Sequence, residues 1–379
     1  MVSSSAVRLC AVGDIALGGS LQFPSQWSIE EYGNPHLLAL LRRCEITFAN
    51  LDCTFDCSGI PPHPDEYLVS APVEQLDLIA ALGMDVVSQA NNHSMDYGGD
   101  SLAITRAGLR RRNVATVGTG GNLAEAGSPV IIERKGTKVG VLAYASTHHW
   151  VGAYAAGLAS PGVAPLEIQE VEGAVKELAG EVDCVVVSMH WGKEFLSYPP
   201  PENVSVAHRI VDAGAKIVLG HHPHVVQGIE NYQDGVICYS LGNFVFPDYP
   251  DQGLFFEGQN HDSILAVFKI EGQSVEVSEI VPCRFSGQRI DQLSPEEATK
   301  FLAKLEELSA AISQADYSTF WSRQLKVHEL ARIKRVFRDQ VIRAGWKNGA
   351  KRIITVGRKN LRSIGRSIDE ILFSSRPSG

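Results

Sequence analysis

The stretch GAKIVLGHHPHVVQGIE, residues 214–230, decides the expected fold of this chain. An apolar run stops at Gly220, and three histidines follow within four residues. This pattern predicts a buried strand, a tight turn and a second strand that begins near residue 225. His222 and His224 are two positions apart on the turn and can direct both imidazoles at one point, where neutral imidazole binds Zn, Mn or Fe. The alternative is a polar loop whose histidines bind nothing.

Composition favours a large soluble core. The chain has 379 residues, 44% of them hydrophobic, which fits an α/β core with an appendage and argues against global disorder. No apolar run approaches the roughly 20 residues of a membrane span, and the first residues lack the pattern of a secretory signal. The seven cysteines are odd in number and scattered, as expected for free thiols in a reducing cytoplasm. We therefore expect a cytoplasmic protein.

Charge separates a tail from the core. From Phe320 onward 15 Lys/Arg face 4 Asp/Glu, a net charge of +11, so the preceding residues carry −20. We expect a domain at 1–290 and a helical, basic extension at 291–379. Within 361–372, apolar residues recur at helical spacing with arginines between them. Such a helix either lies on an anionic membrane or polyanion, at the inner face of the membrane, or packs against the core. The acidic core argues against nucleic acid as a partner.

Strands alternate with helices along most of the chain. The predicted strands are 6–12, 46–49, 85–88, 114–117, 130–132, 139–144, 184–188, 216–219, 236–240, 264–270 and 275–281, and the predicted helices are 75–82, 100–112, 166–178, 204–213 and 296–312. This order predicts an α/β fold with a mostly parallel sheet and helical cover. The strand-rich later part indicates a second sheet packed on the first.

Polar side chains follow five of these strands within a few residues. They are Asp14, Asp52, Asn92, His93, His190, His222 and His224. Ligands of open α/β sheets gather beyond the carboxyl ends of the strands, so these groups are expected to share one site. Each polar loop could instead be a local stabilising feature, but five coincidences favour a common site.

At these residues the sequence resembles the CapA family, known for capsule and poly-γ-glutamate synthesis. Six motifs carry the resemblance, in the family's order: GDIALGG at 13–19, ANLD at 49–52, ANNHSMDYG at 90–98, MHWGKEF at 189–195, GHHPHVVQGIE at 220–230 and YSLGNFVF at 239–246. The family is similar in fold to calcineurin-like metallophosphoesterases. The resemblance therefore implies a two-sheet α/β/β/α sandwich of the metallophosphoesterase type, followed by a C-terminal helical extension.

The resemblance also implies a metal site. Its implied ligands are Asp14, Asp52, Asn92, His190, His222 and His224. One ion would take Asp52, Asn92, His190 and His222, and the other Asp14, Asp52 and His224. The second ion should bind more weakly, because Ala16 stands where the wider fold has a histidine. Asp52 is shorter than the glutamate usual in the family at the bridging position. Nitrogen-rich ligation favours one or two divalent transition-metal ions, namely Mn, Zn or Fe.

Other residues are assigned roles around these ligands. His93 and Asp96 are the implied catalytic pair, with His93 assisting departure of the leaving group, or else orienting Asn92 or Asp96 by a hydrogen bond. The candidate substrate contacts are Asn91, Trp191, Glu194, Ser240 and Asn243. Glu194 could instead orient an imidazole as a carboxylate behind the ligands, or be a solvated loop residue.

Two classes of function remain open on this basis. A metal ion held by such ligands would promote hydrolysis of a phosphoester or γ-glutamyl amide. Alternatively, the protein is a non-catalytic component that binds an anionic polymer during its assembly or export. Turnover of an aryl phosphate with Mn would favour the enzyme.

Overall fold

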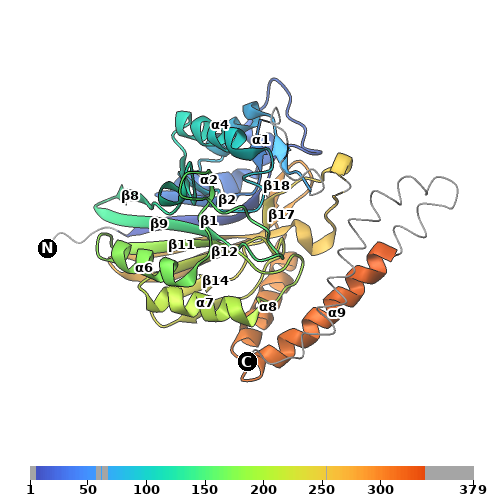
Figure 1. Ribbon diagram of the computed structural model, residues 1–379. Helices are drawn as coiled ribbons and strands as arrows, with labels where there is room; N and C mark the ends of the chain where they lie inside the picture. The colour runs from blue at the N-terminus through green and yellow to red at the C-terminus, as the bar shows by residue number, and fades with distance from the viewer. Residues whose placement is uncertain (1–5, 57–60, 62–66, 253, 338–379) are drawn as a thin grey trace. The chain divides into compact units, whose positions relative to one another are not determined.

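The computed structural model describes residues 6–56, 61, 67–252 and 254–337. Two sheets pack face to face (Figure 1). The first runs in the order β18 (Ile290–Gln292), β17 (Ser274–Phe285), β16 (Asp262–Glu271), β1 (Val7–Ile15), β2 (Ile46–Leu51), β5 (Val86–Ser88) and β6 (Ala115–Val117), and β15 (Asn243–Val245) also pairs with β1. The second runs in the order β13 (Ile229–Tyr232), β14 (Gly235–Cys238), β12 (Ile217–His221), β11 (Cys184–His190), β9 (Thr137–Ala145) and β8 (Val130–Arg134).

Helices cover the outer faces of both sheets. Figure 1 shows α2 and α4 on one side of the sheets and α6 and α7 on the other. The α-helices described up to residue 312 are α1 (Ile29–Tyr32), α2 (Pro35–Arg43), α3 (Leu76–Ala81), α4 (Gly98–Arg111), α5 (Leu123–Ala126), α6 (Ile168–Ala179), α7 (Pro201–Asp212) and α8 (Pro295–Ile312). Two small sheets pair β3 (Thr54–Phe55) with β4 (Ser70–Ala71) and β7 (Thr119–Gly120) with β10 (Gly162–Val163). The predicted α/β/β/α sandwich is confirmed.

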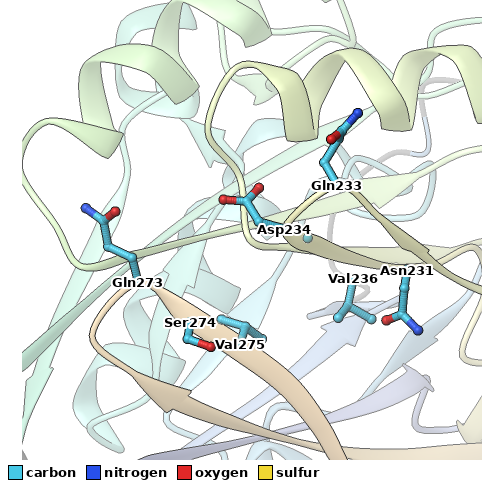
Figure 2. A pocket seen from close by; sticks show the side chains of 8 residues that line it. Asn231, Gln233, Asp234, Val236, Gln273, Ser274 and Val275 are labelled. Atoms are coloured by element: carbon cyan, nitrogen blue, oxygen red, sulfur yellow. The ribbon is translucent and has the colours of Figure 1, made fainter.

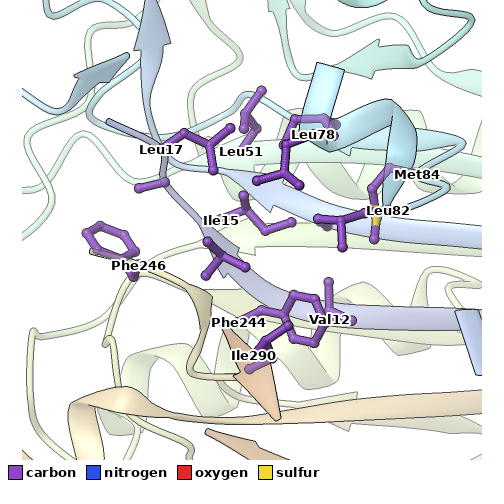
Figure 3. Close-up of a cluster of buried hydrophobic side chains, with 14 of the residues drawn as sticks. Val12, Ile15, Leu17, Leu51, Leu78, Leu82, Met84, Phe244, Phe246 and Ile290 are labelled. Atoms are coloured by element: carbon purple, nitrogen blue, oxygen red, sulfur yellow. The ribbon is translucent and has the colours of Figure 1, made fainter. Parts of the chain in front are cut away.

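Strand β1 is apolar on both faces because each face is buried in an apolar cluster. Side chains alternate between the faces of a strand. Cys10 and Val12 join the cluster under the helices, part of which appears in Figure 3, whereas Leu9 and Ala11 join the cluster between the sheets. A strand buried on both faces reads as a near-continuous apolar run. The sequence pattern of β1 therefore follows from its central position.

Helix α2 was not predicted from the sequence. The Asn34 side chain accepts from His36 N at 2.9 Å, and Pro35 occupies the first helical turn, where it needs no backbone partner. The helix buries a run of leucines, including Leu37 and Leu41. Its capping signal is sound, but its length of 9 residues gives few periods by which to recognise it.

Parallel pairing brings the polar residues to one edge of each sheet. In the register of β1, Asp14 lies opposite Asn50 of β2 and opposite Asn243 of β15. In the second sheet His190 lies opposite His221. Asp14 and His190 thus lie inside the ends of their strands, not after them as expected.

The expected strand at residue 225 is a wrong prediction. Val226 forms only an isolated bridge with Leu241, and the next strand, β13, begins at Ile229. Residues 222–228 instead form an irregular loop, in which His222 and His224 adopt a left-handed backbone conformation that turns the chain. That loop, and not a strand, carries His222 and His224.

The segment 239–243 passes between the two sheets and approaches each at a glycine. A Cβ at Gly13 would lie 2.0 Å from Gly242 O, and one at Gly220 would lie 1.9 Å from Tyr239 O. Both distances are far below any normal contact. Only glycine at these positions allows the backbones to come so close.

The chain divides into two compact units, the first ending at Ile312 and the second beginning at Ser313. α8 therefore belongs to the first unit, although the extension was expected to begin at 291; that functional division stays a prediction. The second unit contains α9 (Tyr317–Phe337). The basic segment 361–372 lies outside the described residues. Within the described part of the chain, no helix combines the length and apolar character needed to span a bilayer.

Candidate metal centre

Two carboxylates and one imidazole converge in a buried cluster at the ends of β1, β2 and β12. One ligand atom each from Asp14, Asp52 and His224 lies within 4.8 Å of the others, and all three residues are buried. His224 Nδ1 is 3.5 Å from Asp14 Oδ2, and its Nε2 is 3.9 Å from Asp52 Oδ2. The structure thus brings together the three residues expected to hold the second ion.

Asp52 shows that this cluster fits a cation. Its side chain is completely buried, yet neither carboxylate oxygen has a hydrogen-bond partner among the described residues. Burial, together with the charge of Asp14, raises the pKa of Asp52 to about 7, although His93 and His224 act in the opposite direction. A buried carboxylate without donors is costly unless a cation compensates for it. The donor set of carboxylate and imidazole suits Mn, Zn or Fe.

The other predicted ion has its donors nearby. Asn92 Oδ1 lies 2.8 Å from His190 Nε2, which is 3.8 Å from Asp52 Oδ1. The rings of His190 and His222 are 4.8 Å apart between centroids. Burial, reinforced by the neighbouring histidines, lowers the pKa of His190 well below its usual value. The ring therefore stays neutral at pH 7, which is the form that binds metals.

The loop histidines each keep one ring nitrogen for a ligand. Both adopt left-handed backbone angles, with φ of 93° for His222 and 56° for His224, which are uncommon outside glycine. His222 Nε2 is 3.0 Å from Trp150 O, so its buried Nδ1 is left without a hydrogen-bond partner among the described residues. His224 Nδ1 donates to Asn243 Oδ1 at 2.9 Å, which leaves Nε2 towards Asp52. Such outer hydrogen bonds fix the orientation of metal-binding imidazoles.

Burial also sets the charge of His222. It lowers the pKa of this imidazole to about 4, against the opposing influence of Glu194 and Asp14. His222, like His190, is therefore neutral at pH 7 and has a lone pair available.

Two residues of the site were missed by the sequence analysis, although both lie in quoted motifs. His221 Nδ1 and Asn50 Nδ2 are each 2.9 Å from Asp14 Oδ1. Burial alone would raise the pKa of Asp14, but His221, His224 and Asn50 together bring it below the usual value. Asp14 is thus held as a carboxylate in a defined orientation. His221 is the first histidine of GHHPH, and that motif was the available signal for it.

His93 and Asp96 form a pair beside this cluster. His93 Nδ1 is 2.9 Å from Asp96 Oδ2, and His93 Nε2 is 3.0 Å from Asn92 Nδ2. Burial disfavours the charged ring, but the adjacent Asp96 carboxylate raises the pKa of His93 to about 9. Asp96 Oδ2 also accepts from Val69 N at 2.6 Å, which fixes the carboxylate. The contact with Asn92 Nδ2 is a hydrogen bond only while His93 Nε2 is unprotonated, because the amide nitrogen is a donor.

The five expected substrate contacts differ in exposure. Glu194 is exposed, and its carboxylate lies within 4.8 Å of ligand atoms of His222 and His224. The other four are buried and make internal hydrogen bonds: Asn91 Nδ2 to Leu51 O at 2.8 Å, Trp191 Nε1 to Tyr239 O at 3.1 Å, Ser240 Oγ to Val225 O at 2.7 Å and Asn243 Oδ1 to His224 Nδ1 at 2.9 Å. Their contact with a substrate stays a prediction, and their observed contacts position the loops.

A separate pocket of about 510 Å³ lies between two hairpin turns, near the amino end of β14 (Figure 2). Its lining includes Asn231, Gln233 and Gln273, and its one charged side chain, Asp234, pairs with Lys216. None of the predicted site residues lines it. This pocket is therefore distinct from the metal cluster.

The sequence matches the model of a family described as bacterial capsule synthesis protein PGA_cap over residues 8–248. The capsule biosynthesis protein CapA of Bacillus anthracis is 30% identical over 325 residues, covering 84% of this chain and 76% of that protein. The PGA biosynthesis protein CapA of Bacillus subtilis (strain 168) is 32% identical over 210 residues, covering 55% of this chain and 53% of that protein. The crystal structure of a calcineurin-like phosphoesterase from Bacillus subtilis is similar with a TM-score of 0.40 and 14% identity, covering 80% of this chain and 97% of that one.

Proposed function

Because this chain belongs to the PGA_cap family of bacterial capsule synthesis proteins, we propose that it serves capsule or poly-γ-glutamate synthesis as a metal-dependent hydrolase. The bond cleaved is a phosphoester or a γ-glutamyl amide. The observation that carries this proposal is Asp52, whose two buried oxygens have no hydrogen-bond partner among the described residues and face His190 and His224. The substrate is accordingly an anionic polymer or a phosphoester.

One or two ions of Mn, Zn or Fe would occupy the cluster. The proposed ligands are Asp14, Asp52, Asn92, His190, His222 and His224. When bound, such an ion polarises an ester or amide oxygen and lowers the pKa of water.

The chain's own residues prepare the reaction. Asn243 and the backbone carbonyl of Trp150 hold the rings of His224 and His222, so that their free nitrogens need no reorganisation. With Nδ1 fixed on Asp96, which raises the pKa of the ring, His93 would hold a proton on Nε2 once the Asn92 amide nitrogen turns away from it, and would donate that proton to the leaving group.

Metal analysis joined to a substrate panel tests the proposal. Wild type, Asp52→Asn and Asp85→Asn would be assayed with aryl phosphates and γ-glutamyl peptides in the presence of Mn. Asp52→Asn should lose bound metal and turnover. Asp85→Asn is the control, because this carboxylate contacts Thr47 and Arg134 before β5, at the opposite strand ends.

The outcomes separate the two classes of function. Metal content that is unchanged in Asp52→Asn would contradict the ligand assignment. Tight binding of poly-γ-glutamate by the metal-loaded wild type, with no turnover of any substrate, would favour the non-catalytic polymer-binding component.

A further inference from the structure

The loop after β11 is fixed against the histidine loop at both ends. Trp191 N donates to His221 O at 3.1 Å, and Phe195 N donates to Pro223 O at 2.7 Å. Glu194 lies between these two hydrogen bonds, next to Phe195, whose φ of 61° turns the chain sharply. The position of Glu194 relative to the histidines is therefore set by backbone contacts and not by a mobile loop tip.

Glu194, His222 and His224 form a second group of ligand atoms, all within 4.8 Å of one another. The two histidines are buried, whereas Glu194 is exposed. Carboxylate and imidazole donors bind a transition-metal ion at about 2.0–2.2 Å. A Glu side chain has three rotatable bonds and can close the remaining gap from the solvent side.

The histidine nitrogens available to this group are defined by their other contacts. Trp150 O occupies His222 Nε2, and His222 Nδ1, in a residue that is 1% exposed, has no hydrogen-bond partner among the described residues. Asn243 occupies His224 Nδ1 and leaves only Nε2. A buried nitrogen without a partner is a cost that a cation removes.

A shortage of ligands points in the same direction. The inner set of Asp14, Asp52 and His224 offers three residues, because Ala16 contributes no ligand atom. His222 and His224 each have one free nitrogen and can bind one ion at a time. The Glu194 set therefore competes with the inner ions for both histidines.

From this geometry, and resting on the proposed metal-dependent function, we propose that Glu194 is a metal ligand. With His222 and His224 it forms a cation site at the exposed margin of the buried cluster. Its ion is the exchangeable one, because one of its three ligands is open to solvent, and it is the ion that an incoming anionic substrate meets first.

Titration of metal-depleted full-length protein with Mn²⁺, followed by equilibrium dialysis and electron paramagnetic resonance, tests this site. Glu194→Gln keeps the length and hydrogen-bonding capacity of the side chain but removes its charge. We expect it to weaken the more weakly held Mn²⁺ at least about tenfold and to change its resonance signal, while the tightly held ion stays. Glu194→Asp should recover part of the affinity. Glu202→Gln, an exposed glutamate at the start of α7, is the matched control and should bind as wild type.

Identical Mn²⁺ affinity and resonance signal in wild type and Glu194→Gln would overturn the inference. This holds even if the turnover of Glu194→Gln is lower, because Glu194 would then contact the substrate and not the metal. Wild type that binds no Mn²⁺, Zn²⁺ or Fe²⁺ would instead defeat the proposed function itself. Circular dichroism of each variant separates loss of the site from loss of folding.

Discussion

His93 differs from two other buried histidines of the cluster. Its pKa is raised, whereas the pKa values of His190 and His222 are lowered. Asp96 raises the pKa of His93 to about 9, whereas burial lowers that of His222 to about 4 and that of His190 well below its usual value. Neighbouring groups whose environments push their pKa values apart commonly divide acid and ligand roles between them. Asp96 therefore favours a proton on His93, which the contact of Nε2 with Asn92 Nδ2 opposes, and the two other rings offer lone pairs.

Replacing His93 tests that division. His93→Ala should retain the bound metal, because His93 is not a proposed ligand, and should lower turnover by about 10²- to 10⁴-fold, the usual contribution of a positioned proton donor. Elemental analysis and steady-state assays measure the two effects. His208→Ala is the control, since His208 also pairs with a carboxylate, Glu230, but lies on α7. Retention of both metal and full activity would make His93 a structural residue.

The sequence identified the residue types of the site but not which side chains face the cluster. The H-x-H spacing selected His222 and His224, and both lie at the cluster. His221 was passed over because nothing in a one-dimensional pattern states that the last residue of a strand also faces the site. Asn91 and Trp191 follow strands in quoted motifs, but their side chains donate to the backbone oxygens of Leu51 and Tyr239. Three-dimensional packing decides which of two adjacent polar residues faces the cluster.

At the scale of elements, the segment 239–243 depends on glycine at its crossings. Gly220→Ala would place a Cβ 1.9 Å from Tyr239 O, a backbone atom that cannot move without displacing Asn243 and its contact with His224. We expect a loss of about 1–3 kcal/mol in the free energy of unfolding, measured by urea denaturation. Gly173→Ala is the control, because it lies inside α6 with nothing within 4 Å, and it should gain about 0.5–1 kcal/mol. Equal effects of the two changes would contradict the close approach.

Glu45, before β2, links strand β1 to the β8–β9 turn. Its carboxylate accepts from Arg8 N at 2.8 Å and from Lys135 Nζ at 2.7 Å. Burial opposes its ionisation, but Arg8 and Lys135 lower the pKa of Glu45 from 4.5 to about 2. Because the folded pKa is the lower one, the stabilisation is complete above about pH 4.5 and is lost as pH falls towards 2.

Glu45→Gln should therefore destabilise the protein at pH 7 by about 1–2 kcal/mol, a value reduced for the partial exposure of Arg8 and Lys135. The difference in the free energy of unfolding between Glu45→Gln and wild type should shrink as the pH falls from 4.5 to 2. Chemical denaturation at each pH measures it. Glu133→Gln, an exposed change in the same hairpin, is the control. A difference that is constant with pH would exclude a titrating Glu45.

Element order was predictable and element ends were not. Apolar runs located most strands of both sheets, because central strands buried on both faces have no polar interruption. The ends of β1 and β11 continue through Asp14 and His190, since backbone pairing does not stop where side chains become polar. The prediction of a strand at 225 was wrong because two apolar residues, Val225 and Val226, are buried without forming a strand ladder.

At the scale of the whole molecule, the basic charge of the tail and the acidic charge of the core predict that the tail binds anionic surfaces. Truncation before Phe320 should leave the metal cluster intact and weaken attachment to anionic vesicles, with each lost basic contact worth about 1 kcal/mol near such a surface. Vesicle sedimentation at low and high salt measures this, since the attraction fades as salt screens it. Equal sedimentation of both forms at low salt would rule out a membrane role.

The proposed ligands come from both layers of the sandwich. Asp14 lies in β1 of the first sheet, and Asp52 and Asn92 follow β2 and β5 of that sheet. His190 lies in β11 of the second sheet, and His222 and His224 follow β12. The unfolded chain scatters these groups over residues 14–224, so an ion could recognise them only in the assembled protein. Folding and ion uptake would then be one equilibrium, and free ion at a hundred times its dissociation constant would add about 2.7 kcal/mol to the folded state. Ion supply would thereby contribute to the stability of the fold as well as to its chemistry.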